Sequence, residues 1–289
     1  MLRYLRSELF RLRRRRMTLV LVLLMAVIPV ILYAVLYASA QAQLQEIRSG
    51  AAPAAPGQTE EAIQELLDML RPDSVPTFGL GIVAAIGTVL AIVLAGSVTG
   101  NEFGWATIRT VLAHGGRRAS FLLAKVVALV AVTAVIVLVG FASALVASYA
   151  VSITGDLDLA TAADLPSRTL GDMARTLYVT LPYIAFAVLM SVVARSAASG
   201  IAFGLVLSFG ESLVGQLAVA VNRDLQALFD AGIARNVAAI TRTQQTTSFS
   251  SPEPLSSDLW LSALILALYT VAFVALAVDR LAKRDVTLA

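Results

Sequence analysis

The chain has 289 residues, of which 58% are hydrophobic and 14% charged, with a net charge of +3. A single soluble core of this size does not bury so much apolar surface, so the composition excludes an ordinary soluble domain and predicts a membrane protein. The absence of cysteine excludes disulfides, iron–sulfur clusters and thiol chemistry.

The N-terminal segment, residues 1–16, carries seven arginines and one acidic residue, Glu8. Its apolar residues recur at helical spacing between the arginines. This pattern predicts an amphipathic cytoplasmic helix that lies in the headgroup layer. A cluster of charge that only sets the orientation of the chain is the alternative interpretation, and the two are compatible. The apolar positions are Leu2, Leu5, Leu9 and Leu12.

Six apolar runs are long enough to cross a bilayer, for which a helix needs about 20 mostly apolar residues. They predict an all-α membrane protein with a single transmembrane domain spanning residues 1–289. The first run, followed by "ASAQA", also resembles a cleavable signal peptide, but it exceeds the usual signal core of about 7–15 residues. The predicted spans are residues 17–39, 78–99, 126–153, 177–193, 200–221 and 259–278.

The charges outside these runs predict the orientation. The two termini, the connection between spans two and three and the turn between spans four and five hold 15 basic and four acidic residues. The other three loops hold 14 acidic and seven basic residues. Short basic loops stay in the cytoplasm, so both termini are expected there.

Two of the acidic loops contain helical patterns. The first, residues 40–77, begins as an Ala/Pro/Gly-rich linker. It continues into a helix with Thr59 as its N-cap and an apolar face that we expect to rest on the bundle. The third, residues 222–258, predicts one or two short helices that dip back towards the membrane. The apolar face of the first helix consists of Ile63, Leu66, Leu67 and Leu70.

No catalytic motif is present in the sequence. It has no G-x-x-x-x-G-K-[ST] phosphate loop and no cluster of His, Asp and Glu at metal-ligand spacing. The single histidine, His114, is expected to be a solvated loop residue. The chain is therefore predicted not to be an enzyme, to bind no cofactor or metal, and to borrow its energy if it moves a substrate uphill. The basic excess is explained by topology and does not favour nucleic-acid binding.

The segment "GNEFGWATIRTVLAHGGRRASFLLAK", residues 100–125, interrupts two apolar runs with charge. Trp105, Ile108 and Leu112 form the apolar face of a short predicted helix that the sequence "HGG" ends. A helix parallel to the membrane, with one face on the spans and the other towards the cytoplasm, can transmit a push from a docked partner.

This segment resembles the cytoplasmic connection of ABC exporter membrane subunits of the type-2 permease family, whose pattern is E-x-x-x-G-T-x-R-x-x-L-x-x-G/P-x-x-R followed by a lysine. Ala106 departs from it at the usual glycine. The arginine-rich start, the six runs, the large first outer loop and the basic tail "DRLAKRDV" extend the resemblance over the whole chain. The matching residues are Glu102, Thr107, Arg109, Leu112, Gly115, Arg118 and Lys125.

The resemblance implies a permease that pairs with a second copy or a paralogue and binds two cytoplasmic ABC ATPase subunits. ATP and Mg²⁺ would be bound by those subunits, and the chain would export a substrate across a bacterial cytoplasmic (inner) membrane. The family's coupling helix corresponds to residues 102–118. Arg109 and Arg118 are the best candidates for polar contacts with the ATPase; the alternative is that they anchor the segment to lipid phosphates. The remaining coupling candidates are Glu102, Trp105, Thr107, Ile108, Leu112 and Gly115.

Three residues of the fifth predicted span stand out. Glu211 is a carboxylate inside an apolar run, where ionisable residues are functional candidates. We expect either a structural hydrogen-bonded role or a contact with substrate. Gly200 and Gly204 have the small-xxx-small spacing of close helix packing. Packing within one subunit is favoured over a dimer contact.

Two other classes of function remain open. A stand-alone secondary transporter or channel would be expected to carry several intramembrane charges, and Glu211 is the only one within the predicted spans. A non-transporting membrane scaffold would not need the pattern in residues 102–118. Association with an ATPase would separate the permease from both.

Overall fold

All regular elements are helices in the part of the chain that the computed structural model describes, which confirms the predicted all-α class for that part. The described residues are 2–49, 59–104, 118–155, 165–211, 213–214, 217, 231–242 and 259–283. Within them, five helices are long and apolar enough to cross a membrane.

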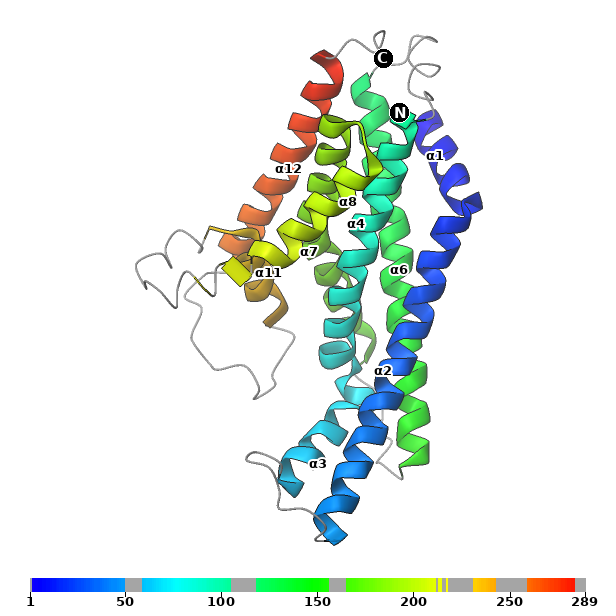
Figure 1. Ribbon diagram of the computed structural model, residues 1–289, viewed down its shortest axis with the longest axis vertical. Coiled ribbons are helices and arrows are strands. Elements are labelled where there is room, and N and C mark those ends of the chain that lie inside the picture. The colour runs from blue at the N-terminus through cyan, green and yellow to red at the C-terminus, as the bar shows by residue number, and fades with distance from the viewer. Residues whose placement is uncertain are drawn as a thin grey trace.

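The long helices run roughly along one axis of the molecule, whereas α3, α8 and α11 are inclined to it (Figure 1). Short 3₁₀ and π turns, Pro72–Ser74 and Val75–Gly79, lead into α4, and a π turn, Val206–Gly210, follows α8. The helices are α1 (Leu2–Arg14), α2 (Arg16–Ser49), α3 (Glu60–Met69), α4 (Leu80–Gly104), α6 (Arg118–Thr154), α7 (Leu165–Ala194), α8 (Ala197–Leu205), α11 (Ile233–Arg242) and α12 (Leu259–Lys283).

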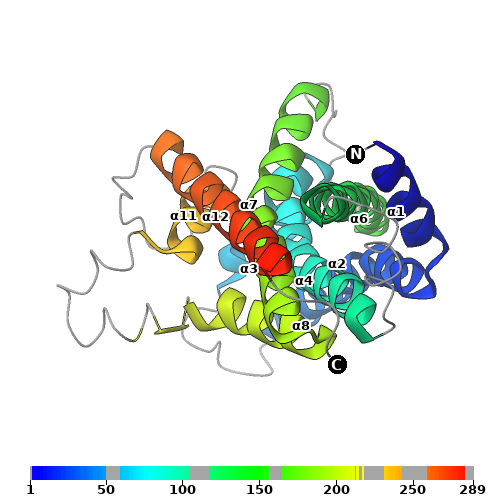
Figure 2. The same ribbon diagram turned by 90° about the horizontal axis from the view of Figure 1, so that it is seen from above.

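Helices α4 and α7 form the centre of the bundle. α4 packs against α7, α8, α6 and α2, while α12 packs on α7 and α1 packs on α6. Among the five long helices α2 and α12 are the least buried, and the view from above places them on opposite sides (Figure 2). Their exposed apolar side chains, such as Leu23 and Leu268, suit contact with lipid.

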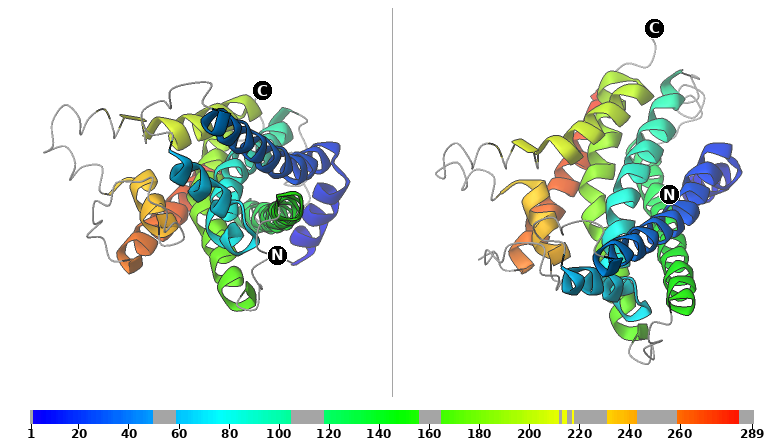
Figure 3. Two further views of the ribbon diagram at one scale, coloured as in Figure 1. Left: turned by 90° about the horizontal axis from the view of Figure 1, so that it is seen from below. Right: turned by 60° about the horizontal axis from the view of Figure 1, so that its bottom comes forward.

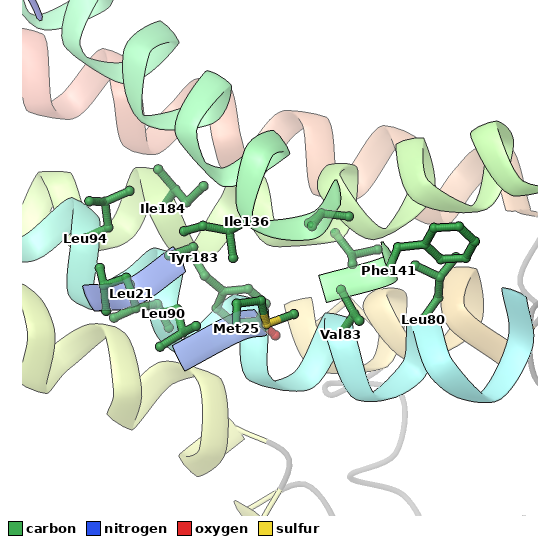
Figure 4. Packing of buried hydrophobic residues seen from close by; sticks show 14 of the residues in the cluster. Leu21, Met25, Leu80, Val83, Leu90, Leu94, Ile136, Phe141, Tyr183 and Ile184 are labelled. Carbon is green, nitrogen blue, oxygen red and sulfur yellow. The ribbon is translucent and has the colours of Figure 1, made fainter. Parts of the chain in front are cut away.

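Large aliphatic and aromatic side chains fill the space between these helices. Met25 from α2 lies with Val83 of α4 and Ile136 of α6, and Tyr183 of α7 closes the same region (Figure 4). Met25 and Ile136 are fully buried. The interior therefore joins helices that are distant in sequence, and this packing positions both ends of the bundle.

Helix α2 is longer than the sequence predicted. The first outer loop was expected to begin at residue 40, but α2 continues to Ser49, and Ala40 and Leu44 are buried. The run that follows the span consists largely of good helix formers, so the helix continues beyond the apolar stretch. Its 34 residues correspond to about 50 Å, whereas the hydrocarbon layer is about 30 Å thick. The lower part of α2 thus projects out of the membrane, with α3 beside it (Figure 3).

The predicted helix in the first outer loop is confirmed. Thr59 is the N-cap of α3, and its hydroxyl oxygen accepts a hydrogen bond from the Ala62 N–H at 3.2 Å. Ile63, Leu67 and Leu70 are buried. The Ser148 hydroxyl of α6 donates to the Leu70 carbonyl at 2.6 Å, which fixes the end of α3 against the bundle.

Two other predicted boundaries differ. The second outer loop was predicted to end at residue 176, but α7 already begins at Leu165 because the polar stretch before the apolar run continues the same helix. In the fifth predicted span, 200–221, the described helical run covers Ala197–Gly210, which is shorter than a spanning helix. Residues 212, 215–216 and 218–221 of that prediction lie outside the described residues.

Small residues allow α4 and α8 to touch. A side chain at Gly96 would place its Cβ 2.7 Å from Cγ1 of Ile201 and 3.1 Å from the carbonyl carbon of Gly200. A Cβ on Gly200 would fall on the Ser191 hydroxyl, and one on Gly204 would meet Ile92. The close packing predicted for Gly200 and Gly204 is therefore found inside one subunit, against a matching Gly96-x-x-x-Gly100 pair on α4 that the sequence analysis did not single out.

Candidate functional site

A buried cluster of ion pairs lies at the end of the bundle where α1, the C-terminal end of α4 and the start of α6 meet. The Lys125 ammonium donates to Oε2 of Glu8 at 3.0 Å and to Oε1 of Glu102 at 2.7 Å. The Arg11 guanidinium lies 3.4 Å from Glu8 and 3.7 Å from Glu102. These four side chains from three helices are called the ion-pair cluster below.

Burial makes the cluster a strong structural constraint. The side chains of Lys125, Glu102 and Glu8 are 1%, 2% and 4% exposed, whereas Arg11 is 38% exposed. Two carboxylates without water need two cations close by, because a single uncompensated buried charge costs several kcal/mol. The ring of Phe121 adds a favourable surface, with the Lys125 nitrogen 5.1 Å from its centroid.

The cluster fixes α1 to the bundle. Glu8 and Leu12 lie on the buried face of α1, and Tyr4 packs edge-on against Phe121 with ring centroids 6.3 Å apart. The arginine-rich start forms the helix α1, whereas its place in the headgroup layer stays a prediction. One face is buried in the protein against α6, and its opposite face is exposed.

A second contact anchors the start of α6. Nη1 of Arg118 donates to the carbonyl oxygens of Leu281 and Ala282, at 3.1 and 3.0 Å. These carbonyls belong to the last turn of α12, where an arginine satisfies groups that the helix itself leaves without partners. Arg118 therefore joins the first residue of α6 to the C-terminal end of α12.

The two anchors bracket the predicted coupling segment. Glu102 lies two residues before α4 ends at Gly104, and Arg118 begins α6. The ends of α4, α6 and α12 lie at the same end of the molecule as α1 (Figure 1). Of the predicted coupling residues, the structure thus places Glu102 and Arg118 at the two ends of the segment. The others lie outside the described residues: Trp105, Thr107, Ile108, Arg109, Leu112 and Gly115.

Glu211 lies beside a different element. It follows the π turn after α8, and its carboxylate lies close to the backbone N–H groups of Ile233 and Ala234. These are the first two residues of α11, where a helix leaves donors without partners of its own. Within the described part of the chain, Oε2 of Glu211 is buried without a hydrogen-bond partner, so the structural role and the contact with substrate both stay predictions.

The sequence analysis missed Glu8 and Arg11 as members of the cluster, although both left a signal. Glu8 is the sole acidic residue among seven arginines and shares a helical face with Leu5 and Leu12. A carboxylate on an apolar face needs a buried cation. Lys125, inside the apolar run "FLLAKVVALV", is the matching signal.

The ion-pair cluster is suited to holding helices in position. Within the described ranges, no group of three or more His, Asp and Glu side chains is placed to hold a metal ion. The carboxylates of the cluster face Lys125 and Arg11 of the same chain, while Oε2 of Glu102 has no hydrogen-bond partner among the described residues. The cluster can hold α1, α4 and α6 together at the end of the bundle where α4 ends and α6 begins.

Comparison with known proteins identifies the family of this chain. The family model described as ABC-2 family transporter protein matches residues 4–286, which confirms the resemblance seen in the sequence. The comparison with curated proteins gives no match. The match covers α1, all five long helices and both anchors of the segment between α4 and α6. The chain therefore belongs to the ABC-2 transporter family and is a multi-pass membrane permease of an ABC transporter.

Proposed function

We propose that this permease exports a substrate with energy from separate cytoplasmic ABC ATPase subunits, and that residues 102–118 are the segment on which such a subunit docks. The chain is proposed to work as a pair, with a second copy or a paralogue. ATP and Mg²⁺ would be bound by the ATPase subunits, so the permease itself would not be an enzyme.

One observation carries the docking proposal. The two ends of the segment between α4 and α6 are anchored. The buried pair Lys125–Glu102 anchors the end next to α4, and the contact between Arg118 and α12 anchors the end next to α6. Movement imposed on a segment fixed in this way is passed to three helices of the bundle. A docked subunit can shift the permease only through contacts that differ between its own states, and the two anchors supply the rigid connection such contacts need.

The proposed orientation places these ends in the cytoplasm. Arg11, Arg118 and Arg280 lie on elements at one end of the bundle, and the acidic helix α3 lies at the opposite end (Figure 1). Since basic ends of membrane proteins face the cytoplasm, we propose that both termini lie inside a bacterial inner membrane. The substrate path would then run between the paired permeases.

Affinity purification from the native membrane in mild detergent tests this function. We expect an ATPase to accompany the tagged chain in about equal amount, and the variant Arg109→Glu to lose it at least about tenfold, since reversing one charge costs a contact of roughly 1–3 kcal/mol. Arg109 is preferred to Arg118, because Arg118→Glu would also break the contact with α12 and disturb the permease itself.

Arg48→Glu is the matched control. It reverses one charge at the far end of α2, where Arg48 pairs with Glu60 at 3.0 Å. We expect this variant to retain the ATPase. If no ATPase co-purifies with the unmodified chain, the docking proposal is wrong. The result would then favour a stand-alone transporter or a scaffold as the function. If both variants lose the ATPase equally, the segment is not the docking site.

A further inference from the structure

The outward face of α1 carries a basic hollow that the ion-pair cluster does not use. The hollow has a volume of about 340 Å³, and its described lining consists of Phe10, Arg13 and Arg14. Glu8 and Leu12 are buried on the opposite face, and Phe10 is 58% exposed. The Arg14 guanidinium lies 4.6 Å from the centroid of the Phe10 ring.

The charges of this hollow are not balanced by the described part of the chain. The nearby acidic residues Glu8 and Glu102 face Lys125 and Arg11, and Asp279 pairs with Lys283 at 2.8 Å. Among the described residues, no carboxylate lies within ion-pair distance of Arg13 or Arg14. Two exposed guanidinium groups beside one hollow make a suitable receptor for a phosphate, which they bind by charge-assisted hydrogen bonds.

The position of the hollow indicates that the phosphate belongs to a lipid headgroup. The start of α2 follows α1 directly, and its exposed apolar residues Leu19, Val20 and Leu23 suit contact with acyl chains. A hollow a few residues before that surface lies at headgroup depth, where arginines meet anionic lipids. The exposed Phe10 extends the apolar surface towards the same layer, so a lipid fits both the charge and the apolar side of the hollow.

We propose that Arg13, Arg14 and Phe10 form a binding site for the phosphate headgroup of an anionic phospholipid from the adjoining leaflet. A lipid bound there stabilises the packed position of α1 through its exposed face, while Glu8 stabilises the same position through the buried face. The site therefore couples the lipid composition of the membrane to the docked position of α1, independently of any ATPase.

Native mass spectrometry of the purified full-length chain in detergent tests the proposal, with phosphatidylglycerol and phosphatidylcholine of equal chain length as probes. We expect phosphatidylglycerol to bind more tightly than phosphatidylcholine. We expect Arg13→Gln/Arg14→Gln to lower that affinity about tenfold or more, since each surface arginine contributes measurably to anionic lipid binding.

Arg280→Gln/Lys283→Gln is the control, because it removes two exposed basic residues of α12 at the same end of the molecule, and α12 lies apart from α1 (Figures 1 and 2). We expect its lipid affinity to stay within about twofold of the unmodified chain. Equal loss in both double variants would mean general attraction to the basic end and would overturn the site. Equal binding of the two lipids by the unmodified chain, which needs no variant to fold, would overturn it as well.

Two further measurements distinguish a bound lipid from other ligands of the hollow. Inorganic phosphate at millimolar concentration should not displace phosphatidylglycerol; if it does, the hollow is a site for free anions. If Arg13→Gln/Arg14→Gln keeps its lipid affinity but loses a co-purifying ATPase, the hollow is a protein contact and the lipid proposal fails. Hydrogen exchange of residues 2–14 gives the structural measure, and we expect added phosphatidylglycerol, but not phosphatidylcholine, to slow it.

Discussion

At the scale of single residues, Lys125 determines how three helices meet. Its ammonium lies between carboxylates contributed by α1 and α4, and all three side chains are nearly inaccessible to water. A buried charge that loses its partner is costly, while an exposed ion pair is worth little. The contribution of each ion pair to the stability of this protein therefore depends on how deeply the pair is buried, and not on which residue types form it.

Replacing Lys125 tests that statement. We expect Lys125→Met to lower the free energy of unfolding by about 3–5 kcal/mol, since Glu8 and Glu102 are left buried without their shared cation. Arg48→Met, which breaks the exposed pair with Glu60, should cost at most about 1 kcal/mol. Thermal unfolding of both variants in one detergent measures the difference. Equal midpoints would show that the cluster does not hold the helices.

Glu211 yields a second prediction at this scale. We expect Glu211→Leu to raise hydrogen exchange of residues 233–242 about tenfold, because the first N–H groups of α11 lose the carboxylate that lies close to them, worth roughly 1 kcal/mol or more. Glu211→Gln keeps an oxygen acceptor and should raise exchange less. If Glu211→Leu leaves the exchange of α11 unchanged while transport is lost, the residue contacts substrate and does not act as a cap.

At the scale of elements, the crossing of α4 and α8 depends on the absence of side chains. The backbones meet at Gly96 and Gly200, and the Ser191 hydroxyl of α7 donates to the Gly96 carbonyl at 3.3 Å and to the Ala187 carbonyl at 2.8 Å. Three helices thus share one contact point close to the turn that connects α7 and α8. Arg195 in that turn has a φ of 53°, a left-handed conformation that few non-glycine residues adopt.

A pair of identical substitutions tests the crossing. We expect Gly200→Ala to lower the free energy of unfolding by about 1–3 kcal/mol, because the methyl group would overlap the Ser191 hydroxyl and approach the Ala187 carbonyl at 2.9 Å. Gly171→Ala, in α7, meets nothing within 4 Å and should be neutral or stabilising by up to about 1 kcal/mol. Unfolding midpoints in detergent provide the comparison, and equal midpoints would mean that α8 can shift without cost.

At the scale of the whole molecule, the distribution of charge predicts which end faces the cytoplasm. Because the chain contains no cysteine, a single cysteine introduced at any position is labelled without background. We expect Glu61→Cys on the exposed face of α3 to react with a membrane-impermeant maleimide on intact cells. Arg6→Cys on α1 should react only after the cells are opened. The reverse pattern would invert the proposed topology and exclude ATPase docking on residues 102–118.

The sequence determined the elements whose signals are local. Five of the six predicted spans, the amphipathic α1 and the capped α3 all follow from runs of apolar residues or helical spacing. The ends were less predictable: α2 and α7 continue into polar stretches such as "AQAQLQEIRS", since helix propensity, which hydropathy does not measure, extends them.

Tertiary structure decided which polar residues meet. The pattern of residues 102–118 pointed to Glu102, but only the packing of α1 on α6 brings Glu8, 117 residues away from Lys125, to the same ammonium. Likewise the spacing of Gly200 and Gly204 predicted a close contact without naming α4 as the partner. The sequence by itself determined that this is a helical membrane protein of the ABC-2 type, because apolar length and charge asymmetry act locally along the chain. Which charges pair and which helices touch depends on contacts between distant segments, and these exist only once the bundle has packed.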